Sequence, residues 1–170
     1  MLSKCRDTFI RKAADYGTSW RIFRPESVTD QIFIKAKRIR TIQEKGVQKV
    51  EDPVVDDYIG LFNYSVMGVI QLEGVSGDYF ADDVDFACDA YEKVTAEIGE
   101  LYEKKNHDYG EAWRDLRLES IVDLILVKLI RIRQIETNGG VASSEGVRSN
   151  YMDIANYALF SMILMQEQGD

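Results

Sequence analysis

Cysteine, histidine and proline are scarce in this chain of 170 residues, which contains two, one and two of them respectively. Cys5 and Cys88 form no CxxC pair, and together with the single His107 they exclude a metal site rich in cysteine or histidine. Any bound metal would therefore need carboxylate ligands. The few prolines leave long stretches in which apolar residues recur with the period of a helix. We therefore predict an all-α fold.

Basic residues are outnumbered by acidic ones, and the formal net charge is −8. This charge argues against direct binding of duplex DNA, which draws on many Lys and Arg contacts to phosphate. A small anionic ligand held by a local basic cluster remains compatible with it. The chain also lacks a run of roughly 20 apolar residues, the length of a membrane span, and begins with charge rather than with a signal-peptide core. We expect a cytoplasmic protein that does not contact membranes.

The second half of the chain repeats the first half without a gap, at an offset of 93 residues. A repeated unit with one apolar face usually buries that face against its copy. We therefore predict two tandem-duplicated three-helix units that form a pseudo-two-fold helical bundle. The matched pairs are Lys12/Lys105, Asp15/Asp108, Tyr16/Tyr109, Trp20/Trp113, Glu26/Glu119, Asp30/Asp123, Lys35/Lys128, Arg38/Arg131 and Asn63/Asn156.

The periodicity also predicts the helix boundaries and the linker between the two units. Residues 73–80 are glycine-rich and lack periodicity, as is typical of a linker. The first repeat then covers 1–72 and the second 81–170, within one compact domain. The expected helices lie at 3–14, 27–45 and 54–72 in the first unit, and at 81–106, 120–137 and 147–167 in the second.

A lysine interrupts the apolar stripe of the second helix in each unit, Lys35 in the first and Lys128 in the second. Both lysines share a face with the neighbouring isoleucines, so we expect them to point toward the core or a cleft within it. A desolvated ammonium needs an anion. Arg38 and Arg131 lie one turn further on and could complete a Lys/Arg pincer on phosphate. The alternative is that each lysine reaches solvent or pairs with an inward carboxylate.

The last helix of the second unit is apolar nearly all round, yet it contains Asp153 and Asn156 on one face. An acid buried in such a helix must meet a cation. Mg²⁺ is one candidate and Lys128 is the other. The first unit lacks this acid, because Gly60 occupies the equivalent position.

Glu119 and Asp123 lie four residues apart at the start of the second helix of the second unit, a spacing that would let both face one ion. The same stretch contains a helix-capping pattern, Ser120-x-x-Asp123, which is also present in the first unit from Ser27. We expect the serines to cap the helices, and Glu26 and Glu119 to be the better ligand candidates.

The DYGxxW loop offers flat aromatic surfaces on which a nucleobase could stack. These are Tyr16 and Trp20 in the first unit and Tyr109 and Trp113 in the second. Anchoring in the core is the alternative for all four side chains. Asp108 is expected to cap or orient its loop.

A set of motifs recurs in both halves in the order DYGxxW, KxxR and NY. In the second half these are Lys105-Asn-His-Asp-Tyr-Gly-Glu-Ala-Trp113, then Lys128 and Arg131, then Asp153-Ile-Ala-Asn-Tyr-Ala. The set resembles the nucleotide-modification-associated domain family of phages and bacteria. A more distant similarity is to the MazG-like all-α NTP pyrophosphatases. That similarity implies that acids on two adjacent helices bind Mg²⁺, and that a nucleoside triphosphate is cleaved to a monophosphate and pyrophosphate.

Transferred to this chain, the resemblance implies that Glu119, Asp123 and Asp153 hold Mg²⁺ and act in catalysis together with Lys128. MazG proteins carry ExxE and then ExxD, whereas this chain has Glu119-x3-Asp123 and Asn150-x2-Asp153, a reduced set of acids. The expected substrate-binding residues are Lys105, Asp108, Tyr109, Trp113, Arg131 and Asn156, with Lys35, Arg38, Tyr16 and Trp20 from the first half.

Two functional hypotheses follow from these residues. The first is a Mg²⁺-dependent nucleoside triphosphate pyrophosphohydrolase or a related nucleotide-processing enzyme. The second is a noncatalytic nucleotide-binding or scaffold protein in a DNA-base modification or phage-related pathway. A small-molecule nucleotide is the expected partner in both cases. We lean slightly to a homodimer, although a chain that forms an internal pseudo-dimer could also be a monomer.

Overall fold

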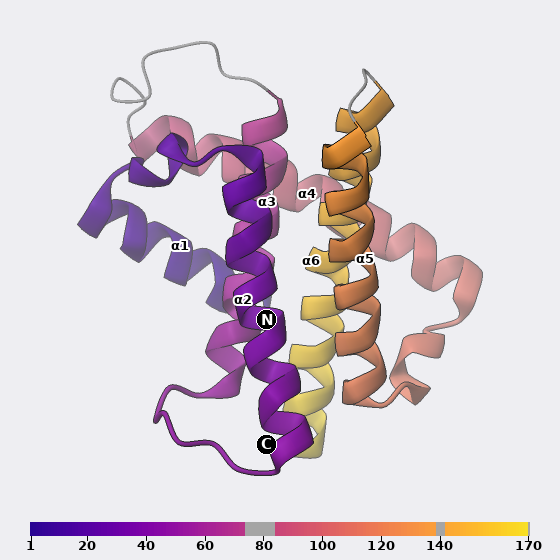
Figure 1. The fold of residues 1–170 in the computed structure, drawn as a ribbon. Coiled ribbons are helices and arrows are strands. Elements are labelled where there is room, and N and C mark those ends of the chain that lie inside the picture. Colours follow the sequence, from indigo (N-terminus) through magenta and orange to yellow (C-terminus); the bar gives the residue numbers. More distant parts are fainter. Residues whose placement is uncertain (74–83, 139–141, 170) are drawn as a thin grey trace.

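The computed structural model describes residues 1–73, 84–138 and 142–169, and this part of the chain contains helices and no strand (Figure 1). The same order of elements occurs twice. The first half contains α1 (Leu2–Tyr16), the 3-10 helix η1 (Ser19–Ile22), α2 (Pro25–Lys45) and α3 (Val54–Leu72). The second half contains α4 (Val84–Tyr109), the 3-10 helix η2 (Ala112–Asp115), α5 (Leu118–Asn138) and α6 (Ala142–Gln168). The predicted all-α fold is confirmed.

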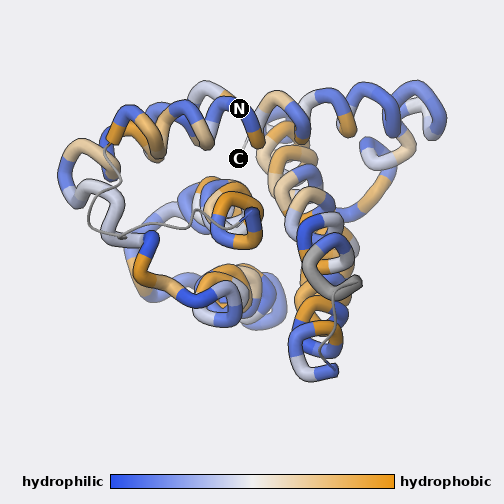
Figure 2. Tube along the Cα trace, turned by 90° about the horizontal axis from the view of Figure 1, so that it is seen from above, coloured by the Kyte–Doolittle hydropathy of each residue, from blue (hydrophilic) through white to orange (hydrophobic). Residues whose placement is uncertain are grey.

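The helices form three layers, and each half contributes one helix to each layer. α3 and α6 pack against each other in the middle, and α2 and α5 lie side by side in front of them (Figure 1). α1 and α4 run across the back of this four-helix bundle (Figure 2). The two halves are thus arranged about the contact between α3 and α6, as a pseudo-two-fold bundle requires.

Apolar side chains at helical spacing build the core. On α2 and α5 the predicted stripe is buried; its members include Val28, Ile32, Ile39, Ile121, Ile125 and Ile132. α6 is buried nearly all round because it lies in the middle layer and packs against three other helices. Neither α6 nor any other helix in the described ranges is long and apolar enough to cross a membrane.

The second helix of each half begins earlier than the capping pattern predicts. α2 starts at Pro25, with Arg24 as the N-cap residue and no side-chain hydrogen bond to the cap. Proline suits the first helical position because its φ angle is preset and it has no N–H group to leave unpaired. Ser27 therefore lies inside the first turn, and Ser120 does so in α5, which starts at Leu118. The predicted capping role of the two serines is wrong.

The predicted linker of residues 73–80 lies outside the described residues, apart from Glu73. Glu73 follows the last residue of α3 and accepts a hydrogen bond from Arg148 of α6 at 3.2 Å. The predicted domain boundaries therefore stay a prediction.

Candidate functional site

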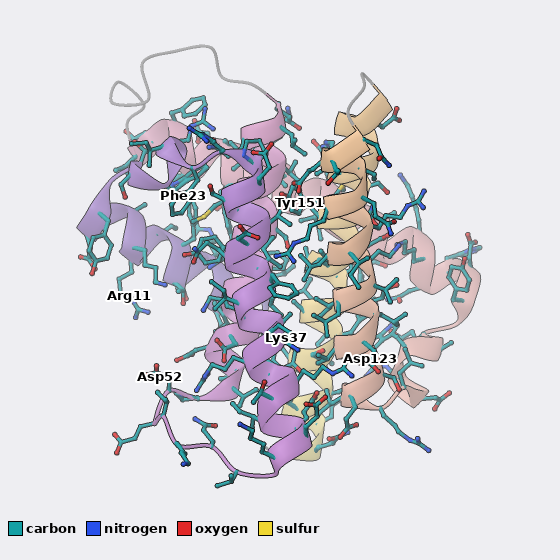
Figure 3. The ribbon with its side chains drawn as sticks, in the orientation of Figure 1. Arg11, Phe23, Lys37, Asp52, Asp123 and Tyr151 are labelled. Carbon is teal, nitrogen blue, oxygen red and sulfur yellow. The ribbon has the colours of Figure 1, made fainter. Side chains whose placement is uncertain are left out.

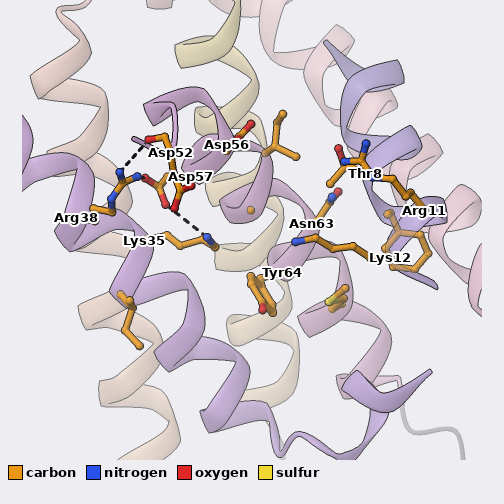
Figure 4. Close-up of a pocket in the computed structure, with 15 residues that line it drawn as sticks. Thr8, Arg11, Lys12, Lys35, Arg38, Asp52, Asp56, Asp57, Asn63 and Tyr64 are labelled. Carbon is orange, nitrogen blue, oxygen red and sulfur yellow. Dashed lines mark hydrogen bonds and ion pairs between the residues drawn. The ribbon is translucent and has the colours of Figure 1, made fainter. Parts of the chain in front are cut away.

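A cavity of about 480 Å³ opens in the first half between α1, α2 and α3 (Figure 4). Its volume falls within the range of small-molecule sites, roughly 300–1,000 Å³. Arg11 of α1 and Asp52 of the loop after α2 line it and extend on the same side of the molecule (Figure 3). The charged and polar residues of the wall include Arg11, Lys12, Lys35, Arg38, Asp57 and Tyr64.

Lys35 and Arg38 of α2 meet an acid of the chain itself. Asp57 is 5 % exposed and lies in the first turn of α3, where the helix dipole favours a carboxylate. It accepts a hydrogen bond from Arg38 Nη1, and its Oδ1 lies 3.4 Å from Lys35 Nζ. Arg38 Nη2 also donates to the carbonyl oxygen of Asp52 at 2.9 Å. The predicted pincer is present, but it closes on an inward carboxylate, which was the alternative.

Gly60 makes room for the side chain of Lys35. A Cβ atom built on residue 60 would lie 2.4 Å from Lys35 Cε and 2.5 Å from its Cδ. The stem of the lysine therefore lies directly over the glycine. Beyond Gly60, the side chain of Lys35 extends toward that of Lys12, which comes from the opposite wall of the cavity (Figure 4).

Lys12 is exposed and has no ion-pair partner within the described part of the chain. It therefore directs an uncompensated positive charge at the same gap as Lys35. Two like charges that share a gap repel each other, and an anion placed between them would remove this repulsion. The two ammonium groups leave room for an anion at this end of the cavity.

The second half arranges the equivalent lysines around an acid. Asp153 stands at the position equivalent to Gly60, and its side chain is 13 % exposed. Its Oδ1 pairs with Lys105, and its Oδ2 lies 2.8 Å from Lys128 Nζ. A carboxylate of the chain thus satisfies both lysines here. The first half has the same two lysines without a carboxylate between them, and Lys35 pairs instead with Asp57.

Arg38 has an ion-pair partner and its equivalent, Arg131, has none among the described residues, because the two halves also differ at the position of Asp57. Arg38 is held by Asp57, whereas Asn150 occupies the equivalent position in the second half. Arg131 is exposed and has no ion pair with any residue that the structure describes. In the first half the acid is Asp57, and in the second half it stands one helical turn later, at Asp153. Asp57 therefore pairs with Lys35 and Arg38, whereas Asp153 pairs with Lys105 and Lys128.

The three acids predicted to hold Mg²⁺ do not come together. Asp153 is engaged by Lys105 of α4 and Lys128 of α5, whereas Asp123 pairs with Arg40 of α2 at 3.3 Å. Glu119 is exposed at the start of α5. Residues 1–73, 84–138 and 142–169 contain no group of three His, Cys, Asp or Glu side chains that could hold a metal ion. The residues present do not fit the predicted magnesium site.

The aromatic residues of the DYGxxW loops divide into core and surface. Trp20 and Trp113 are 8 % and 7 % exposed and belong to the hydrophobic core. Tyr16 and Tyr109 are exposed at the ends of α1 and α4. Core anchoring is therefore confirmed for the tryptophans only. Asp108 is exposed, and its Oδ1 lies 3.1 Å from Nδ1 of the adjacent His107.

The two equivalent asparagines are both buried, but they differ in their hydrogen bonds. Asn63 donates from Nδ2 to the carbonyl oxygen of Cys5 at 3.0 Å, and its Oδ1 accepts from the Tyr91 hydroxyl at 2.8 Å. Burial raises the pKa of Tyr91, which keeps this phenol protonated as a donor. Neither amide atom of Asn156 has a hydrogen-bond partner among the described residues.

The fold and the site define a duplicated all-α bundle, with a cavity in its first copy that four basic residues and the acids Asp52, Asp56 and Asp57 line. The family described as Nucleotide modification associated domain 1 matches residues 12–72 and again residues 105–165. The chain belongs to this family and contains its domain twice in tandem, which confirms both the predicted family and the predicted duplication. No curated protein and no solved structure matches the chain significantly. The similarity to MazG-like enzymes stays a prediction.

We expect Asp153→Asn to lower the free energy of unfolding by about 2 kcal/mol, because it leaves Lys105 and Lys128 without their shared anion. Removing one partner of a fully buried pair costs about 3–5 kcal/mol, and the partial exposure of the lysines reduces this value. Urea unfolding measures the change. Glu167→Gln is the control, because its pair with Arg114 is exposed and is worth under about 1 kcal/mol. Equal losses in the two variants would contradict the buried pairing.

Proposed function

We propose that this protein binds a nucleotide through its phosphates, in the first-half cavity between Lys12 and Lys35. The observation that carries the proposal is the difference between the halves at one position. Asp153 holds the two equivalent lysines in the second half, whereas Gly60 leaves them to an external anion in the first. A phosphate group offers the same oxygen acceptors as the carboxylate, with more negative charge.

The local charge supports this placement despite the overall net charge of −8. Arg11 and Lys12 line the cavity from α1, and neither has an ion-pair partner in the described ranges. Asp57 engages Arg38 directly and lies at the longer distance of 3.4 Å from Lys35, so that lysine keeps capacity for a second anion. A basic cluster of this kind attracts a small anion even on an acidic protein.

Tyr64 adds a neutral donor to the wall of the cavity. Burial raises the pKa of its phenol, which therefore stays protonated at neutral pH. A protonated phenol can donate a hydrogen bond to a phosphate oxygen without adding charge. The family description, which refers to nucleotide modification, favours a nucleotide over other phosphorylated ligands.

A more specific hypothesis for a nucleotide ligand is that the protein cleaves a nucleoside triphosphate and releases pyrophosphate. It requires Mg²⁺, and the acids proposed to hold the ion are dispersed or neutralised by lysines. Binding that does not depend on a metal is therefore the function that the geometry supports best.

The test is titration calorimetry with deoxynucleoside and ribonucleoside triphosphates, in chelator and in Mg²⁺. We expect binding in chelator, and we expect Lys35→Ala to weaken it roughly tenfold or more, the usual effect of losing a charged contact. The matched variant is Lys128→Ala, which should leave the affinity unchanged. Absence of binding in chelator, or an equal loss in Lys128→Ala, would overturn the proposal. Mg²⁺-dependent pyrophosphate release that is lost in Asp153→Asn would support the hydrolase hypothesis instead.

A further inference from the structure

A second cavity, of about 200 Å³, adjoins the proposed phosphate site. The two cavities share four wall residues, Phe9, Lys12, Tyr64 and Met67. The second cavity is mainly aromatic and apolar, and Trp20 lies in its wall. The charged cavity and the apolar cavity are therefore neighbours, and Lys12 lies in the wall of both.

Trp20 carries a buried donor without an acceptor. Its Nε1 atom has no hydrogen-bond partner within the residues that the structure describes, although the residue is only 8 % exposed. In the second half, Nε1 of Trp113 donates to Asn106 Oδ1 at 3.0 Å. The residue equivalent to Asn106 in the first half is Ala13, which also lines the cavity. An unpaired buried N–H group is costly, so its retention needs a reason.

The side chain that packs on the face of the tryptophan also differs between the halves. Phe160 stacks on Trp113 with ring centroids 4.5 Å apart and an interplanar angle of 6°. The equivalent residue in the first half is Met67, which lines the second cavity with Trp20. The second half therefore supplies a stacked ring and an acceptor to its tryptophan. In the first half a thioether and a methyl group stand at these two positions, and Phe9 contacts the Trp20 ring edge-on with centroids 6.4 Å apart.

We infer that the second cavity receives the base of the bound nucleotide at the edge of Trp20, where the base accepts a hydrogen bond from Trp20 Nε1. The inference rests on the proposed function, because it places the base beside the phosphates that lie between Lys12 and Lys35. Every nucleobase has an acceptor in its ring plane, either a ring nitrogen or a carbonyl oxygen, so it can replace the oxygen of Asn106. The ligand class is therefore a nucleoside phosphate rather than a sugar phosphate or inorganic phosphate.

The first experiment converts the first half into the second by substitution. Ala13→Asn supplies an acceptor to Trp20, and Met67→Phe supplies a ring. We expect each variant to bind nucleoside triphosphates about tenfold more weakly, because Ala13→Asn occupies the donor and Met67→Phe fills the cavity. Affinity for inorganic triphosphate, which has no base, should change by less than about twofold, since the charged groups are untouched. The matched control is Asn106→Ala in the second half, which should alter neither affinity.

The second experiment uses tryptophan fluorescence and does not depend on core substitutions in the first half. The chain has two tryptophans, so a Trp113→Phe protein reports on Trp20 alone and a Trp20→Phe protein reports on Trp113 alone. Contact of the base with Trp20 predicts that a nucleotide quenches the first protein and not the second, and that inorganic triphosphate quenches neither.

The outcomes separate the two proposals. Binding of inorganic triphosphate as tight as that of nucleotides, without quenching of Trp20, would overturn the base cavity and leave the phosphate site standing. Absence of binding by both ligands in the wild-type protein would overturn the phosphate site, and the base cavity with it. Selective loss of nucleotide affinity in Ala13→Asn and Met67→Phe would support the base cavity.

Discussion

Gly60→Asp is expected to abolish nucleotide binding while leaving the protein folded. The new carboxylate would stand where Asp153 stands in the second half and would pair with Lys12 and Lys35, as Asp153 pairs with their equivalents. The stem of Lys35 must move, since a Cβ at residue 60 lies 2.4 Å from its Cε, but a lysine side chain can adjust. Loss of two charged contacts and repulsion of phosphate should weaken affinity by roughly 100-fold or more. Titration calorimetry measures the loss, and thermal melting verifies the fold.

Gly60→Ala separates the steric effect from the charge. It displaces Lys35 without adding a carboxylate, so we expect a smaller loss, about tenfold. Asp153→Gly is the reciprocal variant, and it should give the second half an affinity for inorganic triphosphate that the wild-type half lacks. Retention of full nucleotide affinity in Gly60→Asp would contradict the placement of the phosphates between the two lysines.

Asp57→Asn is expected to increase the affinity for nucleotide phosphates and to lower the stability of the free protein. The acid neutralises Arg38 and part of the charge of Lys35, and it repels a phosphate that approaches them. Its removal should strengthen binding by about tenfold, equivalent to about 1.4 kcal/mol. The free protein should lose about 1–3 kcal/mol of unfolding free energy, because two partly buried cations lose their anion.

The second half already has Asn150 at the position of Asp57, which indicates that the helix accepts this residue. The two effects are measured by calorimetry with inorganic triphosphate and by urea unfolding in the absence of ligand. A fall in affinity would show that Asp57 positions Lys35 and Arg38 rather than competing with the ligand, and would contradict the prediction.

The helices and their faces could be predicted because both depend on local patterns. α3 was predicted at 54–72 and is observed at Val54–Leu72, since apolar residues recur along it at helical spacing. α4 extends to Tyr109, three residues past its predicted end, because Gly110 is the first residue there to leave the right-handed region, with φ of 57°. The start of α2 was misplaced because a proline at N1 specifies a helix start as strongly as a capping serine does.

The predicted metal site depends on which helix faces meet, and order along the chain says little about that. Asp123 and Asp153 follow the order of a metal-binding motif, but the packing of α5 turns Asp123 toward Arg40 of α2. Asp57 was not predicted as a partner of Lys35, although it pairs with that lysine in the structure. A clue was present, since it lies three residues before Gly60 and therefore on the same face of α3.

By itself the sequence determined the all-α fold, the duplication and the family, because helical periodicity and a gapless repeat are properties of the chain read residue by residue. It also determined that Lys35 and Lys128 need anions, since each interrupts an apolar stripe. Only the tertiary structure decided which anion each lysine meets. Lys12, Lys35 and Gly60 come from three different helices, and their relation depends on how α1, α2 and α3 pack. The same packing in the second half brings Asp153 between the equivalent lysines, so there one carboxylate of the chain pairs with both.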